Sequence, residues 1–336
     1  MSIIIVTGAC GFIGSNLVRS LNRLGLEELL LVDDKTKIDS RQNLEGCKFI
    51  KCLDKKVFIE LIKRRTLNMP VSTIFHQGAC TDTTEQNVNY MMHDNYVYSK
   101  EILDWALMSN INLIYASSAS IYGLSSSFEE VAENEKPNNL YSFSKSVFDD
   151  LVRARLQGCK SQIVGLRYFN VYGPHEGFKG KMASLVLKHF HDYREKGYVS
   201  LFEGSHGLLP GEQARDFIYV DDVIAVNLFF LRNSGSSGIY NVGTGQSASF
   251  NELTESTLNA IFVHLKKPKM LLGDMIASNL IRYIPFPQHL LPQYQPFTKA
   301  DINRLRKSGY TESFMPVSLG TETYIHYLIK QYHLNT

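Results

Sequence analysis

The sequence predicts an α/β protein with a doubly wound parallel sheet and a smaller, interleaved C-terminal α/β lobe. Two observations carry this prediction. Short β-branched runs alternate with longer segments of helical period through the first half of the chain, which is the pattern of parallel strands joined by crossover helices. Most of these runs are also almost continuously apolar, as expected for strands that are covered on both faces.

The expected elements follow one another in a regular order. The strands are Ile3–Val6, Leu29–Val32, Phe49–Lys51, Thr73–Gln77, Leu113–Ser117 and Ile163–Tyr168. The helices between them are Phe12–Leu24, Val57–Arg65, Tyr90–Met108 and Ser142–Leu156. After Phe169, loops rich in Gly, Pro and polar residues interrupt the pattern. A helix over Val220–Arg232 and a strand over Gly238–Val242 then restore it.

Composition and charge exclude several classes of protein. The 336 residues include 35 Lys and Arg against 33 Asp and Glu, so the formal net charge is only +2 and favours neither nucleic acid nor an anionic membrane as a partner. No apolar run approaches the roughly 20 residues that span a bilayer, and the N-terminus does not resemble a secretory signal. Five cysteines without a C-x-x-C pair and ten histidines without H-x-x-x-H spacing indicate neither a disulfide framework nor a metal site. We expect a cytoplasmic protein.

The first motif with chemical meaning is a glycine turn between the first strand and the first helix, Thr7-Gly8-Ala9-Cys10-Gly11-Phe12-Ile13-Gly14. Gly8 permits the tight turn, Gly11 lets the backbone approach a pyrophosphate, and Gly14 lets helix and strand pack closely. Free N–H groups at the start of the helix face the negative charge. This context predicts Rossmann-type dinucleotide binding, and the alternative is a structural turn without a ligand.

The second strand ends at Asp33-Asp34, where this fold places the carboxylate that reads the ribose. Asp33 alone favours NAD, because it can accept a hydrogen bond from the 2′-hydroxyl. The cations that follow, which are Lys35, Lys37 and Arg41, could instead hold the 2′-phosphate of NADP. A solvated loop without any phosphate contact is the other interpretation of these cations. The sequence leaves the choice of cofactor open.

A second constellation combines a serine at a strand end with a tyrosine and a lysine on a helix. Ser118 follows the strand Leu113–Ser117, and Tyr141 and Lys145 share one helix face. A phenol with a pKa of about 10 is a poor base unless its anion is stabilised, and Lys145 beside a charged nicotinamide would stabilise it. Tyr141 could then remove a hydroxyl proton while hydride leaves the carbon, with Ser118 orienting the hydroxyl. Alone, such a Tyr and Lys are more often a surface pair.

These motifs carry a family resemblance. With Arg215-Asp216-Phe217 and Asn241-x-Gly243-x-Gly245, they resemble the extended short-chain dehydrogenase/reductases that act on nucleotide sugars, over nearly the whole chain. Further strings narrow the resemblance to the ADP-glycero-manno-heptose 6-epimerases, which make a heptose precursor of lipopolysaccharide core. The strings are His76-Gln77-Gly78-Ala79-Cys80-Thr81, Arg167-Tyr168-Phe169-Asn170-Val171-Tyr172-Gly173-Pro174, Glu176-Gly177-Phe178-Lys179-Gly180 and Phe202-Glu203-Gly204-Ser205.

The resemblance implies a two-base mechanism with tightly held NADP and no net redox change. Carbon six of the heptose would be oxidised to a ketone, the intermediate would turn, and hydride would return to its other face. Because hydride comes from one fixed side, the oxygen occupies two places, and one acid/base group can hardly serve both. The family's second group matches Lys179, opposite Tyr141. Without the resemblance, Lys179 would be interpreted as a solvated loop lysine.

The resemblance also implies the ligand contacts. The cofactor contacts are Gly8, Gly11, Phe12, Ile13, Gly14, Asp33, Asp34, Lys37, Lys55, Gln77, Gly78, Ala79, Cys80, Thr81, Asn95, Tyr141, Lys145 and Val171. The contacts to ADP-heptose are Ser118, Asn170, Lys179, Lys181, Lys188, Phe202, Glu203, Gly204, Ser205, Arg215 and Tyr294. Arg215 suits the pyrophosphate because a guanidinium pairs with phosphate in a fork. Three features depart from the family: Lys181 replaces Ser, Lys188 replaces His, and the loop 206–213 is longer.

The organisation of the chain should be interleaved. We expect an NADP-binding domain from residues 1–169 and 217–243, and a substrate-binding lobe from 170–216 and 244–336. Part of 295–305 would return to the larger domain. A homo-oligomer, by resemblance a homopentamer, is expected, with the helix Tyr90–Met108 as a subunit contact.

Three other functions compete with this interpretation. A nucleotide-sugar 4,6-dehydratase needs a carboxylate pair directly after the catalytic Ser or Thr, where this chain has Ala119-Ser120. A UDP-hexose 4-epimerase is the runner-up, and the loop Glu176–Gly180 argues against it because 4-epimerisation uses no matching lysine. A non-catalytic dinucleotide sensor would not need Ser118, Tyr141 and Lys145 together.

Overall fold

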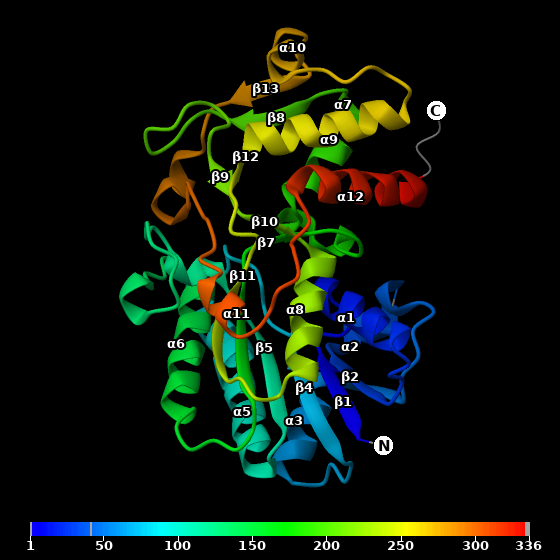
Figure 1. The fold of residues 1–336 in the computed structure, drawn as a ribbon, viewed down its shortest axis with the longest axis vertical. Coiled ribbons are helices and arrows are strands. Elements are labelled where there is room, and N and C mark those ends of the chain that lie inside the picture. Colours follow the sequence, from blue (N-terminus) through cyan, green and yellow to red (C-terminus); the bar gives the residue numbers. More distant parts are fainter. Residues whose placement is uncertain (1, 41, 333–336) are drawn as a thin grey trace.

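The computed structural model describes residues 2–40 and 42–332. Its centre is a seven-stranded parallel sheet with the strand order β11-β6-β5-β4-β1-β2-β3 (Figure 1). The strands are β1 (Ile3–Thr7), β2 (Leu29–Asp33), β3 (Lys51–Asp54), β4 (Val71–His76), β5 (Asn112–Ser118), β6 (Ile163–Tyr168) and β11 (Gly238–Val242). The order reverses between β1 and β4, so the predicted doubly wound sheet is confirmed.

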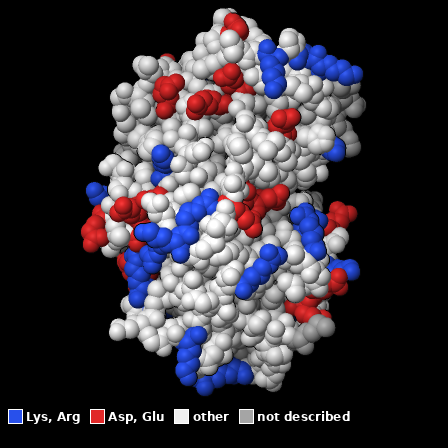
Figure 2. All heavy atoms as spheres, viewed as in Figure 1, with Lys and Arg blue, Asp and Glu red and all other residues white. Residues whose placement is uncertain are grey.

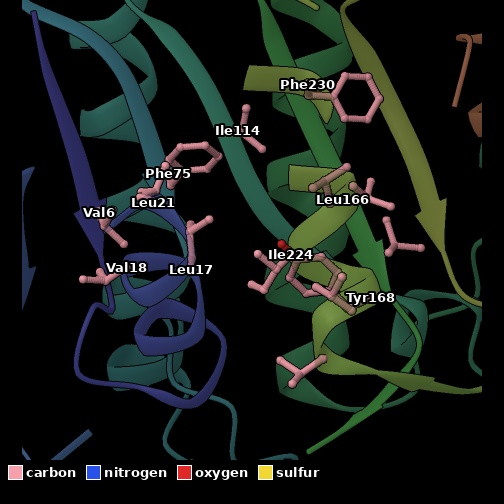
Figure 3. Packing of buried hydrophobic residues seen from close by; sticks show 14 of the residues in the cluster. Val6, Leu17, Val18, Leu21, Phe75, Ile114, Leu166, Tyr168, Ile224 and Phe230 are labelled. Carbon is pink, nitrogen blue, oxygen red and sulfur yellow. The ribbon is translucent and has the colours of Figure 1, made fainter. Parts of the chain in front are cut away.

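Helices cover both faces of this sheet. They are α1 (Phe12–Arg23), α2 (Lys35–Ser40), α3 (Lys55–Lys63), α4 (Val88–Met92), the π-helical turn η2 (His93–Val97), α5 (Tyr98–Ser109), α6 (Leu140–Arg155) and α8 (Val220–Arg232). On one face, α1 contributes Leu17 and Leu21 and α8 contributes Ile224 and Phe230 to an apolar cluster over the strands (Figure 3). The other face is covered by α3, α5 and α6. Burial on both faces explains why the strands are continuously apolar.

A smaller lobe lies above the carboxyl ends of the strands (Figure 1). Its elements are α7 (Leu185–Lys196), β8 (Val199–Phe202), α9 (Phe250–His264), α10 (Leu272–Ala277), β13 (Ile281–Ile284) and α12 (Val317–Tyr332), which share a second apolar core. Short pairs connect the lobe to the sheet: β7 (Asn170–Tyr172) with β10 (Phe217–Tyr219), and β9 (Ala214–Arg215) with β12 (Ala248–Ser249). The helix α11 (Asn303–Lys307) packs against β11, so the chain returns to the sheet after visiting the lobe.

Short segments of 3-10 helix complete the described elements. They are η1 (Gln42–Leu44), η3 (Ala119–Tyr122), η4 (Ala132–Asn134), η5 (Gly177–Met182) and η6 (Gln288–Gln293). Among the described residues, no helix is both long and apolar enough to cross a bilayer. Lys and Arg are interspersed with Asp and Glu on the face that Figure 2 shows.

Three differences from the expectations go beyond a shift of one or two residues at the ends of an element. The strand expected at Phe49–Lys51 begins only at Lys51, because β3 is an edge strand, and Ile50 before it is 46% exposed. The helix expected over Tyr90–Met108 is present but contains the π-helical turn His93–Val97. The segment after Asp33, which the sequence indicated only as a charged loop, includes the short helix α2.

Candidate active site

A cavity of about 840 Å³ lies where the carboxyl ends of the strands meet the smaller lobe, the usual ligand position in such sheets. Its wall contains most of the residues expected from the sequence: Gly8, Gly11, Phe12, Ile13, Gly14, Asp33, Asp34, Lys37, Lys55, Gln77, Gly78, Ala79, Cys80, Thr81, Ser118, Tyr141, Lys145, Asn170, Val171, Lys179, Lys181, Lys188, Phe202, Arg215 and Tyr294. Asn95, Glu203, Gly204 and Ser205 are not part of the wall.

The glycine turn leaves no room for a side chain at Gly8 or Gly14. Gly8 has a φ of +66°, and a Cβ on it would lie 2.6 Å from the Cα of Gly78. A Cβ on Gly14 would overlap the carbonyl oxygen of Gly8, so helix α1 packs directly on the turn. No side chain caps α1 at Gly11. The first N–H groups of this helix are thus left for an anionic ligand, which fits a dinucleotide's pyrophosphate.

Asp33 is a buried carboxylate beside this turn. It accepts hydrogen bonds from the backbone N–H groups of Cys10 and Asp34, each at 2.8 Å. Burial raises the pKa of Asp33, and Lys37, whose Nζ lies 3.9 Å away, opposes the rise. A carboxylate that could accept from a hydroxyl and a cation that could pair with a phosphate therefore lie next to each other. Arg41, the third expected cation, lies outside the described residues.

Lys55 is held by carboxylates of two different elements. Its Nζ lies 3.0 Å from Asp34 and 2.7 Å from Asp94. Burial lowers the pKa of Lys55, but hydrogen bonds to these two carboxylates outweigh it and the net shift is upward. Lys55 therefore stays a cation at the edge of the cavity.

Asn95 shapes the cavity from behind its wall. Its side chain accepts a 2.8 Å hydrogen bond from the N–H of Cys80 and donates to the Cys80 carbonyl and to Ser144. The extra residue of the π-helical turn lets Asp94 reach Lys55 while the adjacent Asn95 reaches Cys80. At this point the sequence shows only two consecutive polar residues. That both side chains face inward is visible only in the structure.

Ser118, Tyr141 and Lys145 meet at one wall of the cavity. Helix α6 starts with a capping box at Asn139, which fixes Tyr141 in its first turn. Lys145 donates a 2.8 Å hydrogen bond from Nζ to the carbonyl of Ala116. Burial lowers the pKa of Lys145 to about 8, against the opposing charge of Asp149. Burial raises the pKa of Tyr141, whereas a hydrogen bond with Ser118 lowers it.

Lys179 reaches the same cavity from the turn η5. Its Nζ lies 5.0 Å from the centre of the Phe12 ring and 3.8 Å from an oxygen of Glu176. Burial lowers the pKa of Lys179, and Glu176 opposes this. The carboxylate of Glu176 is itself fixed by the N–H and hydroxyl of Ser184, at 2.8 and 2.6 Å. Two titratable side chains from distant segments, Tyr141 and Lys179, thus line one cavity.

Arg215 marks the end of the cavity that the smaller lobe forms. It is 7% exposed, and its guanidinium lies 5.1 Å from the centre of the Tyr294 ring and 5.5 Å from that of Phe250. In the part of the chain that the structure describes, no carboxylate forms an ion pair with it. Burial lowers the pKa of Arg215. A buried guanidinium without an acid partner is suited to an anionic ligand.

Several residues of the wall have no counterpart in the sequence-based expectations. Asp82 pairs with Lys181 at 3.0 Å, and Phe178, Met182, Phe217 and Phe250 add apolar surface. Phe178 and Phe217 lie within the quoted motifs but were not expected as contacts, and no local pattern marks Asp82, Met182 or Phe250. Glu203, Gly204 and Ser205 follow Phe202 in an irregular segment, where Gln213 donates to the Glu203 carbonyl. No group of three or more His, Cys, Asp or Glu side chains within the described ranges could hold a metal ion.

Comparisons with a family model and with solved structures identify proteins that are similar to this chain. The family model described as the NAD dependent epimerase/dehydratase family matches residues 4–243. A solved ADP-L-glycero-D-manno-heptose-6-epimerase from Helicobacter pylori is 31% identical, over 97% of this chain and 96% of that one, with a TM-score of 0.78. The UDP-glucose 4-epimerase of Thermotoga maritima, at 22% identity over 98% and 99% of the two chains and a TM-score of 0.77, shares the fold. The chain therefore belongs to the NAD-dependent epimerase/dehydratase family.

Proposed function

We propose that the enzyme is an ADP-L-glycero-D-manno-heptose 6-epimerase that uses tightly bound NADP, with NAD as the other possible cofactor. It would convert ADP-D-glycero-β-D-manno-heptose to its L-glycero isomer in the cytoplasm, for lipopolysaccharide core. The observation that carries the proposal is that Tyr141 and Lys179, from distant segments, line one cavity. The similarity to the Helicobacter pylori enzyme supports the same reaction.

The residues of the cavity fit a nicotinamide dinucleotide. The glycine turn and the start of α1 would take the pyrophosphate, because no side chain caps the helix at Gly11 and its first N–H groups can donate to an anion. Asp33 would accept a hydrogen bond from the ribose, and Lys37 would hold a 2′-phosphate. When bound, the cofactor would supply a hydride acceptor and then a hydride donor for a substrate carbon.

The chain's own residues would divide the proton transfers between two sides. Tyr141 removes the hydroxyl proton on one side, where the charge of Lys145 stabilises the phenolate and Ser118 orients the hydroxyl. After the ketone has turned about its exocyclic bond, its oxygen faces Lys179. Because burial lowers the pKa of Lys179, this amine can exchange a proton nearer to neutral pH than an exposed lysine can.

The substrate's diphosphate would lie toward the smaller lobe. Arg215 supplies a buried guanidinium, and Lys188, whose Nζ lies 5.9 Å from the centre of the Phe202 ring, supplies a second cation. Lys181 extends the positive charge at the rim, where it pairs with Asp82. Asn170 and Tyr294 complete this part of the site. A few individually positioned groups could thus bind two diphosphates, although the net charge of the chain is nearly zero.

The organisation expected from the sequence enters the proposal as well. Residues 1–169 and 217–243 would form the NADP-binding domain, and 170–216 and 244–336 the substrate-binding lobe, with part of 295–305 rejoining the domain. The subunits would form a homopentamer. Exposed apolar side chains on the segment 88–109, Val88 at 54% and Tyr90 at 45%, are compatible with a subunit contact there.

An assay of product stereochemistry tests the proposed function. The purified protein should carry NADP(H), which is released on denaturation and identified by its 2′-phosphate. It should convert ADP-D-glycero-D-manno-heptose to the L-glycero isomer without added cofactor, as followed by chromatography of the two epimers. UDP-galactose is the comparison substrate. Turnover of UDP-galactose with none of the ADP-heptose would overturn the proposal in favour of a UDP-hexose 4-epimerase.

A further inference from the structure

A cluster of buried charges lies behind the wall that carries Ser118, Tyr141 and Lys145. Asp149 and Arg167 are fully buried, and Glu135 is 5% exposed. The Nε of Arg167 donates to an oxygen of Asp149 at 2.9 Å, and its other end pairs with Glu135. Arg153 pairs with Glu135 from the exposed side. None of these four side chains belongs to the cavity wall.

Asp149 connects the helix of the reacting groups to the strand beneath them. It follows Lys145 on α6 by about one helical turn. Its two oxygens accept hydrogen bonds from Tyr115 and Ser117 of strand β5, each at 2.8 Å. Ser117 lies between Ala116, whose carbonyl accepts from Lys145, and Ser118. One carboxylate therefore fixes the strand at the residues next to the chemistry.

The neighbouring strand is built around this carboxylate. Arg167 of β6 is the register partner of Ser117 of β5, so both side chains reach Asp149 from adjacent strands. Gly165 of β6 leaves room for the Tyr115 ring, because a Cβ there would lie 2.5 Å from its Cζ. Helix α6, β5 and β6 thus converge on Asp149.

Stability alone does not require charge at this place. Well-packed apolar residues in place of a buried ion pair are often as stable or more stable, because desolvating two charges is costly. The charge of Asp149 does act on a neighbouring group, which is Lys145. Four titratable side chains lie near the buried Lys145. Asp149 and Tyr141 lie on its own helix, Tyr141 one turn before it, and Cys80 and His76 come from the segment around the end of β4. Burial lowers the pKa of His76 to about 3, so this imidazole is neutral.

We propose that Asp149 is a positioning residue of the reaction. Held by Arg167, it keeps β5 and α6 in register beneath Ser118 and Tyr141, and it supplies the negative charge that faces Lys145. Lys145 then stays an ammonium at neutral pH although it is buried. The effect on turnover rests on the proposed function, whereas the effect on Lys145 does not.

The charge effect can be measured without any substrate. Acetic anhydride acetylates only the neutral amine, so the rate at Lys145 against pH, read by mass spectrometry, gives its apparent pKa. Asp149→Asn keeps the shape and an acceptor oxygen but removes the charge, and it should lower that pKa by about one unit. Glu135→Gln is the matched control. It removes a carboxylate from the same cluster that does not face Lys145, and it should leave the labelling curve unchanged.

The register effect has a separate variant. Ser117→Ala keeps the charge of Asp149 but removes its 2.8 Å hydrogen bond to the strand. With the substrate that the wild type turns over, it should lower kcat several-fold without moving the labelling curve. Asp149→Asn should lower kcat and also move the alkaline limb of the pH profile to lower pH. A merely structural role would lower kcat equally at every pH.

Two further points make the test decisive. If Asp149→Asn does not fold, Asp149→Asn/Arg167→Met removes both charges of the pair and should shift the labelling curve in the same direction, because Asp149 and not Arg167 faces Lys145. A folded variant without Asp149 that has the wild-type labelling curve and wild-type kcat would overturn the proposal. If the wild type does not turn over ADP-heptose, the proposed function fails, and the labelling comparison still decides the role of Asp149.

Discussion

At the scale of single residues, burial sets the chemistry of the site. Lys145 and Lys179 both have lowered pKa values because the cavity wall desolvates them, and each is countered by one carboxylate, Asp149 or Glu176. Burial acts in the opposite direction on Tyr141 and raises its pKa. To act as the base that we propose, the phenol would therefore depend on Ser118 and on the charge of Lys145.

Removing either proton-handling group should stop the reaction. Tyr141→Phe and Lys179→Met should each lower kcat for the ADP-heptose by roughly 100-fold or more, the usual contribution of general acid–base catalysis. Epimer ratios over time measure this. Lys196→Met, an exposed lysine of α7 paired with Asp192, is the control and should be as active as the wild type. Normal turnover by Lys179→Met would contradict the two-base mechanism.

The lowered pKa of Lys145 should also appear in the pH profile. The phenolate of Tyr141 is stabilised only while Lys145 carries its proton. Because burial lowers the pKa of Lys145 to about 8, kcat/KM should decline as the pH rises through this value. Initial rates between pH 6 and roughly 10 test this. Rates that keep rising up to pH 10 would show that the charge of Lys145 is not needed.

At the scale of elements, the sequence predicts whatever is fixed by local pattern. The strand Ile163–Tyr168 and the helix Val220–Arg232 were predicted with their observed bounds, because apolar residues predominate in both and give a clear signal of strand and of helical period. Edge strand β3 was predicted wrongly, since a strand with one covered side lacks that signal. The wall residues at the glycine turn and the strand ends could be predicted. Asp82 and Phe250 could not, because the loop after β4 brings Asp82 to the cavity and packing of the smaller lobe brings Phe250 there.

The contact between the loop after β4 and the turn η5 should influence substrate binding. Lys181 and Asp82 form an ion pair at 3.0 Å, and Lys181 is only two residues from Lys179. Lys181→Met and Asp82→Asn should each raise KM for the ADP-heptose by about two- to five-fold, since exposed ion pairs contribute little. The exchanged pair Asp82→Lys/Lys181→Asp should recover part of the loss if the pair itself matters. If the exchanged pair recovers none of the loss, Lys181 acts directly on the substrate and not through its ion pair with Asp82.

At the scale of the whole molecule, the cavity lies between two packed cores. The glycine turn belongs to the core of the sheet, whereas Phe250 belongs to the core of the smaller lobe. The segments 170–172 and 214–219 pass from one to the other, and β7 pairs with β10 at the crossing. A ligand that contacts both walls binds only the folded arrangement. Each ligand should therefore stabilise the whole chain against unfolding.

Thermal unfolding can separate the two diphosphate sites that we propose. At about 100 times its dissociation constant, a ligand adds roughly 2.7 kcal/mol to the free energy of unfolding, which is several degrees in Tm. ADP, as a fragment of the substrate, should raise the Tm of protein saturated with NADP. Arg215→Met should lose the ADP-dependent rise and keep the rise caused by NADP, because Arg215 lies at the end of the cavity formed by the smaller lobe and the glycine turn belongs to the sheet. Lys37→Met should lose the rise caused by NADP and keep the ADP-dependent rise. It should also weaken the binding of NADP more than the binding of NAD. Loss of both rises in Arg215→Met would mean that the two ligands share one site.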